Sequence, residues 1–96
     1  MNASGTAAGL PPGARPYKKT PVFMETSVPA GLLKDHATKE GVWGIIHVEQ
    51  GELEYTIADQ GVSTRLSPNT QGLVRPTELH YVKPVGPCRF FVEFWR

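Results

Sequence analysis

Cysteine is nearly absent from this chain of 96 residues, in which Cys88 is the single example. One cysteine cannot form an internal disulfide, so the composition excludes the disulfide-stabilised class of small secreted domains. We therefore expect a reduced, cytoplasmic protein whose stability comes from packing alone.

The chain also lacks an excess of charge of either sign. Ten Lys and Arg residues stand against nine Asp and Glu residues, giving a formal net charge of +1 at pH 7. Such a balance provides no field that attracts nucleic acid or an anionic membrane, and we expect neither as a partner. The local cluster of Arg15, Lys18 and Lys19 is typical of a solvated charged group.

Long apolar runs are missing as well. No stretch approaches the roughly 18 apolar residues of a membrane-spanning helix, and from the composition of the first residues we expect no export signal. Residues 1–15 are small or proline-rich, a composition that buries too little apolar area to offset the entropy of ordering, so we predict a flexible N-terminal arm. Residues 16–96 then form a single domain, because a chain of this size has room for one core.

Glycine and proline, in contrast, are abundant, with ten and nine residues respectively. They interrupt the chain too often for helices of ordinary length, and the segments between them are rich in β-branched and aromatic residues. The pattern predicts an all-β protein of about eight strands. The expected strands cover residues 17–25, 30–36, 42–49, 52–58, 62–66, 72–74, 78–83 and 88–95.

Local patterns support several of these strands. Polar and apolar residues alternate strictly after Gly51, which places Leu53, Tyr55 and Ile57 on one buried face. Gly51 marks a tight connection before that strand, and residues 59–61 form a turn after it. So many short strands must cover their edges, and a closed barrel or a two-sheet jelly roll does so; we expect a small β-barrel.

The second half of the chain carries two motifs in a suggestive order. A strand is followed by the segment Gln-Gly-Glu-Leu at residues 50–53, in which Gly51 begins a hairpin. Further along the chain, Pro76 precedes His80 by a few residues. This order resembles the cupin pattern. More narrowly, residues 32–43, 46–48 and 86–94 are similar to small single-domain cupins related to tellurite-resistance proteins, the YeaR/TehB-like group.

The resemblance implies a cupin-like jelly-roll barrel and a link to tellurite or other anionic stress. It assigns His80, and after it His36, as metal ligands. The general first motif is incomplete in this chain, because Thr38 stands where a second histidine would fall and Gly44 occupies the usual position of a glutamate.

The three histidines are the main candidates for chemistry. His36, His47 and His80 all fall on expected strands or strand ends, where a β-barrel can bring them together. Convergent imidazoles with an acidic group form an ordinary ligand set for Zn²⁺, Fe²⁺, Ni²⁺ or Mn²⁺, so we predict a divalent-metal site at these residues. Glu93 lies in an aromatic strand, where a carboxylate is costly unless it is paired or metal-bound. It is the candidate catalytic proton carrier, the alternative being an ion pair with an arginine.

Two functional hypotheses follow. The first is a cupin-type protein with a divalent metal that binds or acts on a small polar molecule or oxyanion; if it is catalytic, it is a metal-dependent enzyme. The second is a non-catalytic ligand-binding or sensing barrel without metal, with a cavity lined by Trp43, Tyr55 and Phe91. A purely structural dimerisation domain is the third reading.

The surface of the expected barrel raises a separate question. Residues 42–49 and 88–95 are apolar on both faces, although a small barrel has only one interior. Either the segment around residues 21–24 or a second copy of the chain must cover the outside. We predict a homodimer.

Overall fold

The computed structural model describes residues 9–96. Within this range the chain forms eight β-strands, two short 3-10 turns and no α-helix, which confirms the all-β prediction. The strands are β1 (Pro16–Lys19), β2 (Phe23–Met24), β3 (Trp43–Gln50), β4 (Leu53–Ile57), β5 (Val62–Leu66), β6 (Gly72–Val74), β7 (His80–Pro84) and β8 (Arg89–Trp95), and the turns are η2 (Ala30–Leu33) and η3 (Ala58–Gln60). No helix in the described range is long and apolar enough to cross a membrane.

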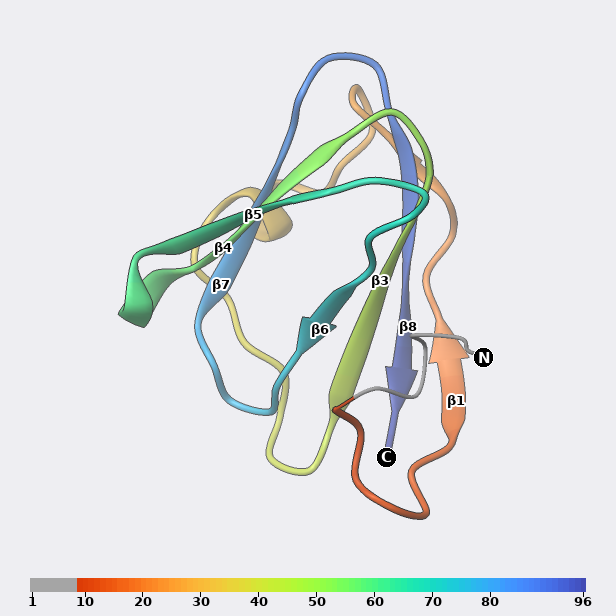
Figure 1. Ribbon diagram of the computed structural model, residues 1–96, viewed down its shortest axis with the longest axis vertical. Helices are drawn as coiled ribbons and strands as arrows, with labels where there is room; N and C mark the ends of the chain where they lie inside the picture. Colours follow the sequence, from red (N-terminus) through yellow and green to blue (C-terminus); the bar gives the residue numbers. More distant parts are fainter. Residues whose placement is uncertain (1–8) are drawn as a thin grey trace.

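Two antiparallel sheets face each other (Figure 1). The larger sheet has the order β1-β8-β3-β6, with β2 also pairing with β8, and the smaller sheet has the order β5-β4-β7. The long central strands β3 and β8 pair from Trp43 opposite Trp95 to Gln50 opposite Arg89. These two strands form the centre of the larger sheet, and their inward-facing residues form part of the core.

The closed barrel that we expected does not form. Strand β6 is only three residues long and is followed by Arg75 and Pro76, and proline has no backbone N–H with which to continue a ladder. Beyond β7 the pairing shrinks to one isolated bridge between His36 and His80. The sheets therefore remain separate, with open space along one side.

The prediction of a strand at residues 30–36 was wrong. After Pro29 the chain makes a single 3-10 turn, in which Leu32 N–H donates to Pro29 O at 2.9 Å. The run Ala-Gly-Leu-Leu contains no β-branched residue, and its glycine and leucines suit a short turn as well as a strand. The strand expected at residues 17–25 is split into β1 and β2, both of which pair with β8.

The core lies between the sheets. It contains Ile46, Val48, Val74 and Phe90 from the larger sheet, Leu53, Tyr55, Leu66 and Val82 from the smaller one, and Cys88. The predicted inward face of β4 is confirmed at Leu53 and Tyr55, which are buried, while Ile57 is half-buried. Gly51 and Gly61 have φ values of +77° and +62°, which confirms the predicted glycine-dependent turns on both sides of β4.

The N-terminal arm was predicted for residues 1–15, of which 1–8 lie outside the described residues. The described part begins with Gly9, which lies against Leu73 of β6: a Cβ atom at Gly9 would come within 2.6 Å of Leu73 Cδ2. The flexibility of the arm stays a prediction.

Candidate functional site

A cavity of about 390 Å³ opens between the two sheets. Its walls come from the inward face of the larger sheet, from β7, and from the segment 36–39 that follows η2. The lining residues are Tyr17, Lys18, Thr20, Leu32, His36, Ala37, Thr38, Lys39, Val42, Ile46, Val74, His80, Val82, Phe90, Val92, Phe94 and Arg96. Two of the three predicted histidines are therefore at this cavity.

His36 and His80 are held together by the backbone. Each backbone N–H donates to the carbonyl of the other residue at 2.9 Å, so the two residues stand directly opposite each other. Side chains of directly opposite antiparallel residues lie on the same face. The two ring centroids are accordingly only 4.1 Å apart, with an interplanar angle of 57°.

The hydrogen bonds of the two rings define which nitrogen can meet a ligand. His36 Nδ1 donates to Lys34 O at 3.0 Å, and His80 Nδ1 donates to Glu78 O at 2.8 Å. A carbonyl oxygen only accepts hydrogen bonds, so the proton of each neutral ring sits on Nδ1. Both Nε2 atoms are left with a lone pair, which can accept a hydrogen bond or coordinate a metal.

Burial keeps His80 in this neutral form. Its side chain is almost completely buried, and desolvation lowers its pKa from the usual 6.5. The bond to the Glu78 carbonyl opposes this shift, and the neighbouring His36 adds to it, because two imidazolium ions side by side repel each other.

Replacing His80 with glutamine is expected to flatten the acid dependence of stability. Because the folded-state pKa of His80 lies below its unfolded value, the unfolded chain binds more protons between the two pKa values. The free energy of unfolding of the wild type therefore falls as the pH drops below about 6.5, and above that value the His80 contribution is constant. Urea unfolding at about pH 7.5 and about pH 5 measures this; equal losses in wild type and His80→Gln would contradict it.

The donor set at the cavity falls short of a complete metal site. Among residues 9–96 no group of three or more His, Cys, Asp and Glu side chains is placed to hold a metal ion. Gly44, which replaces the expected glutamate, does face inward: a Cβ atom there would lie 3.2 Å from Val74 Cβ and 3.5 Å from Val92 Cγ1. The sequence thus places a glycine on the inward face of β3, at the position where the resemblance expects a glutamate ligand.

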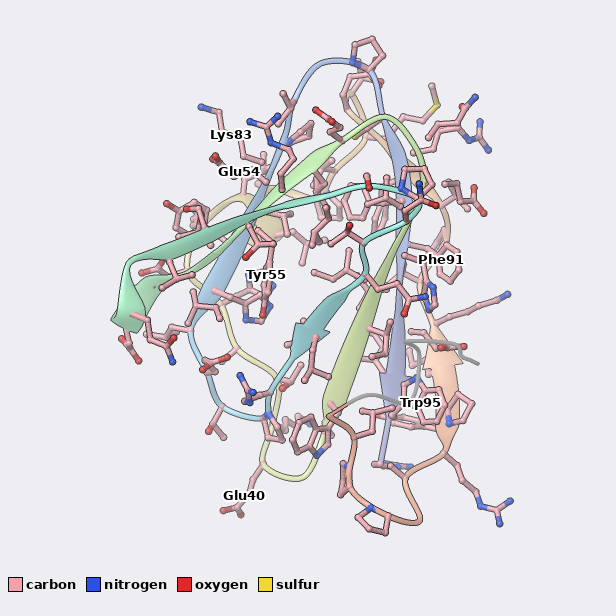
Figure 2. All side chains as sticks on the ribbon, viewed as in Figure 1. Glu40, Glu54, Tyr55, Lys83, Phe91 and Trp95 are labelled. Carbon is pink, nitrogen blue, oxygen red and sulfur yellow. The ribbon has the colours of Figure 1, made fainter. Side chains whose placement is uncertain are left out.

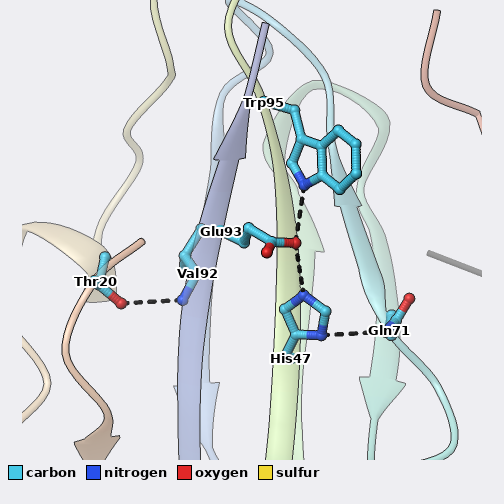
Figure 3. A network of polar contacts seen from close by, with 6 residues as sticks. All are labelled: Thr20, His47, Gln71, Val92, Glu93 and Trp95. Atoms are coloured by element: carbon cyan, nitrogen blue, oxygen red, sulfur yellow. Dashed lines mark hydrogen bonds and ion pairs between the residues drawn. The ribbon is translucent and has the colours of Figure 1, made fainter. Parts of the chain in front are cut away.

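His47 and Glu93 lie on the opposite face of the larger sheet. Because side chains alternate along β3, Ile46 lines the cavity and His47 points away from it. His47 Nε2 donates to Glu93 Oε1 at 3.2 Å, Trp95 Nε1 donates to the same oxygen at 2.9 Å, and the Gln71 amide lies 3.1 Å from His47 Nδ1 (Figure 3). The structure therefore does not bring His47 to His36 and His80.

This outer network explains how a carboxylate is accommodated among aromatic residues. Glu93 is partly exposed, and the Trp95 N–H and the His47 ring satisfy it, in place of the arginine partner considered from the sequence. The His47 ring also stacks on Phe91 with a centroid distance of 4.7 Å. Glu93 as a catalytic proton carrier stays a prediction, and the described geometry places it away from the cavity.

Two of the three residues expected to line the cavity face outward with this network. Trp43 and Phe91 alternate with the lining residues Val42 and Val92 on their strands. Tyr55 points inward between the sheets (Figure 2) and meets His80 edge-on at 5.6 Å between centroids. Tyr55 therefore supports the site without lining the cavity.

Tyr55 also forms a hydrogen bond across the core. Its hydroxyl donates to Leu73 O at 2.9 Å, linking the smaller sheet to β6. Burial, together with the nearby Glu78 carboxylate, raises the pKa of Tyr55 to about 12, so the hydroxyl stays protonated and keeps donating.

Comparison with known families identifies the domain. The profile of the TehB-like domain matches residues 18–92, most of the chain. The chain belongs to the TehB-like domain family. This membership supports the tellurite-resistance association that the sequence resemblance implied. A comparison with curated protein sequences finds no match.

Solved structures share the fold of this TehB-like domain. TehB from Haemophilus influenzae superposes with a TM-score of 0.78 at 24% identity and covers 85% of this chain. The match spans 31% of that TehB chain, so the domain corresponds to about a third of the longer protein. A protein from E. coli strain K12 gives a TM-score of 0.81 at 20% identity, covering 91% of this chain and 94% of the other. A protein from Neisseria meningitidis gives 0.54 at 13%, covering 84% and 81%.

Sequence reasoning missed several residues that line the cavity of this TehB-like domain. Lys18 lines the cavity although its cluster was assigned to solvent, and Leu32, Thr38 and Lys39 join it from the segment expected to be a strand and a loop. The alternation of side chains in β1 did not predict that Lys18 faces the cavity, because a bulge interrupts the pairing of β1 with β8 between Pro16 and Lys18. Only the pairing of strands far apart in sequence reveals these residues.

The outer face of the sheet bears on the predicted homodimer. The segment around residues 21–24, one of the two covers considered, extends the larger sheet as β2 and packs Phe23 against Phe90 with ring centroids 5.6 Å apart. It therefore adds to the core side and does not cover the outer face. The homodimer stays a prediction, which the mass in solution by light scattering would test.

Proposed function

We propose that this TehB-like domain is a ligand-binding or sensing module, whose inter-sheet cavity takes a small polar molecule recognised by His36 and His80. One observation carries the proposal: both Nδ1 atoms are tied to carbonyls and the two ring centroids lie 4.1 Å apart at a cavity, so the neutral rings have their Nε2 atoms left to accept a hydrogen bond. Small-molecule sites are typically concave and mostly apolar, with a few oriented polar groups. This cavity has that composition.

The preferred ligand follows from the state of the rings. Neutral Nε2 atoms accept hydrogen bonds and do not donate them, so the part of the ligand that meets His36 and His80 is a hydroxyl or N–H group. A cupin-like jelly roll, the finer fold that the resemblance implied, would likewise hold its site between two sheets, and the tellurite-resistance association makes an oxyanion a natural probe beside neutral molecules.

A divalent metal ion on the two histidines is the second candidate. Imidazole rings that ligate metals usually donate their other N–H to a carbonyl or carboxylate, and both rings do so here. The lining supplies two protein ligands where catalytic zinc sites use three, so a bound Zn²⁺, Fe²⁺, Ni²⁺ or Mn²⁺ would depend on the ligand or on water for the rest. Such an ion would supply Lewis-acid chemistry, and it is the basis on which the domain would be an enzyme.

Calorimetry with ZnCl₂ on protein without a histidine tag separates the two candidates. Binding of one equivalent that is lost in both His36→Ala and His80→Ala supports the metal site. Binding that survives both substitutions, or no binding at all, leaves the metal-free module as the function. The variant His47→Ala is the matched control, because that ring lies on the other face of the sheet.

Filling the cavity is expected to abolish ligand binding without touching the histidines. Ala37 lines the cavity and is exposed, so a tryptophan there can occupy the entrance at small cost to the fold. We expect chemical-shift changes at Ile46, Val82 and Val92 on addition of small probes, namely tellurite, acetate and short alcohols, to be lost in Ala37→Trp. Ala30→Trp, exposed and outside the lining, is the control. Equal shifts in the wild type and in Ala37→Trp would mean that the probes do not occupy the space beside residue 37, and would overturn the proposal.

A further inference from the structure

The charged residues at the cavity are all of one sign. Lys18, Lys39 and Arg96 line it, and no Asp or Glu is among the lining residues. The whole chain has a net charge of only +1, so three cationic side chains with no Asp or Glu side chain among the lining residues are a local concentration. Positive groups around a low-dielectric hollow attract an anion more strongly than the same groups on an open surface.

These cations gather at one end of the molecule. Lys39 belongs to the turn before β3, since Val42 N–H donates to Lys39 O at 3.0 Å, while Lys18 lies opposite Phe94 near the end of β8. Both places are at the lower end of the view in Figure 1. Glu40, the acidic residue next to Lys39, extends away from the body of the molecule (Figure 2).

Arg96 is oriented by an aromatic contact at the same end. Its guanidinium carbon lies 3.9 Å from the centroid of the Tyr17 ring, and Tyr17 is itself a lining residue. A guanidinium stacked on a ring keeps its N–H edges available for an anion. Lys18 and Lys39 are exposed and bring long, adjustable side chains.

The remaining walls of the cavity are mostly apolar. They include Leu32, Val42, Ile46, Val74, Val82, Phe90, Val92 and Phe94, with Thr20 and Thr38 as polar members. An inorganic oxyanion would satisfy the rim and leave these walls against water. An organic molecule with an apolar body would cover them and gain hydrophobic stabilisation.

We propose that the ligand of this cavity is an organic anion with three parts: a carboxylate or similar group at the rim of Lys18, Lys39 and Arg96, an apolar body, and a hydroxyl or N–H group that donates to His36 or His80. The inference rests on the proposed function, because it takes the same cavity and the same two histidines as the site. It adds the class of molecule that fits.

Three matched probes test the three parts separately. 6-Hydroxyhexanoate carries all of them on a flexible chain, hexanoate lacks the donor, and 1,6-hexanediol lacks the charge. Titrations of ¹⁵N-labelled protein, followed at the amides of Ile46, Val82 and Val92, give the three dissociation constants. We expect 6-hydroxyhexanoate to bind most tightly and tellurite to bind more weakly than either carboxylate.

The rim is tested by a double substitution. Lys18→Met with Lys39→Met keeps the apolar stems and removes two charges, and should weaken 6-hydroxyhexanoate binding by about three- to tenfold, as expected for exposed charges, while leaving 1,6-hexanediol unchanged. Raising the salt concentration should weaken the carboxylates alone. The control is Lys34→Met with Lys83→Met, two exposed lysines outside the lining, and should leave all three probes unchanged.

The outcomes separate this inference from the proposed function. If the diol binds as tightly as the hydroxy acid and the Lys18/Lys39 double variant changes nothing, the anionic ligand is wrong while the cavity remains the site. If tellurite binds more tightly than the carboxylates, the apolar body is wrong. If no probe shifts the cavity amides, both the inference and the proposed function are overturned.

Discussion

Replacing Gly51 with alanine is expected to lower the free energy of unfolding by about 3 kcal/mol or more. Gly51 has φ +77°, a left-handed conformation that costs an L-residue about 1–2 kcal/mol. In addition, a Cβ atom there would collide with the carbonyl oxygen of Pro87 and lie 3.0 Å from Cys88 Cα. Since both obstacles are backbone atoms, relief requires movement of the chain that leads into β8. Urea unfolding followed by tryptophan fluorescence measures the loss.

Gly86→Ala is the matched control for this prediction. Gly86 has nearly the same φ, +78°, but nothing lies within 4 Å of a Cβ atom there. Its substitution should cost only the conformational part, about 1–2 kcal/mol. Equal losses at the two positions would mean that the approach of the Pro87–Cys88 backbone to Gly51 does not contribute to stability.

Replacing Phe90 with alanine is expected to cost about 3–5 kcal/mol. Phe90 is completely buried between the sheets, packs on Phe23 and forms part of the cavity wall. A domain of this length has a total stability on the order of 5–14 kcal/mol, so this variant loses at least about a fifth of that stability and is partly unfolded at room temperature if the wild type lies at the low end of the range. The midpoint of urea unfolding and the dispersion of the amide spectrum report the effect.

Two further variants keep the Phe90 prediction testable if the alanine protein does not fold. Phe90→Leu leaves a smaller void and should fold with a loss of about 1–2 kcal/mol. Phe91→Ala removes the neighbouring ring, which is half-buried on the outer face against His47, and should cost less than half as much as Phe90→Ala. A larger loss at Phe91 than at Phe90 would show that the outer face, and not the space between the sheets, is the main core.

The separation of the histidines into two groups governs how the site is understood. From the sequence, His36, His47 and His80 were all candidates for one metal site, with His80 and then His36 favoured by the cupin resemblance. In the structure His36 and His80 share a cavity, and His47 forms a network with Glu93 on the other side of β3. The alternation in β3 could not decide this in advance, because both faces of that strand are apolar and either could have been the interior.

The segment 30–36 illustrates a different reason why sequence reasoning failed. Its leucines were interpreted as part of a strand, yet the backbone turns at Leu32 and becomes extended at Lys34. Short apolar segments are ambiguous on local grounds, and here packing decides, because Leu32 lies against the core from the turn. The segment after that turn also places His36 at the edge of β7, opposite His80.

The sequence by itself determined the local features of this TehB-like domain. The spacing of glycine and proline excludes helices, the alternation in β4 defines its buried face, and the glycines at 51 and 61 carry the left-handed turns. Each of these depends on one residue or its near neighbours, whose conformational limits are intrinsic.

Only the tertiary structure decided which residues meet. The bridge from His36 to His80, the two sheets in place of a closed barrel, and the basic rim of Lys18, Lys39 and Arg96 all join segments far apart in the chain. An alternating strand specifies two faces but neither its partner nor its register, which follow from packing the whole chain at once. The candidate site is therefore a product of strand pairing: the Pro76-to-His80 motif indicated one of its residues, but no short-range motif indicates which other residues meet it.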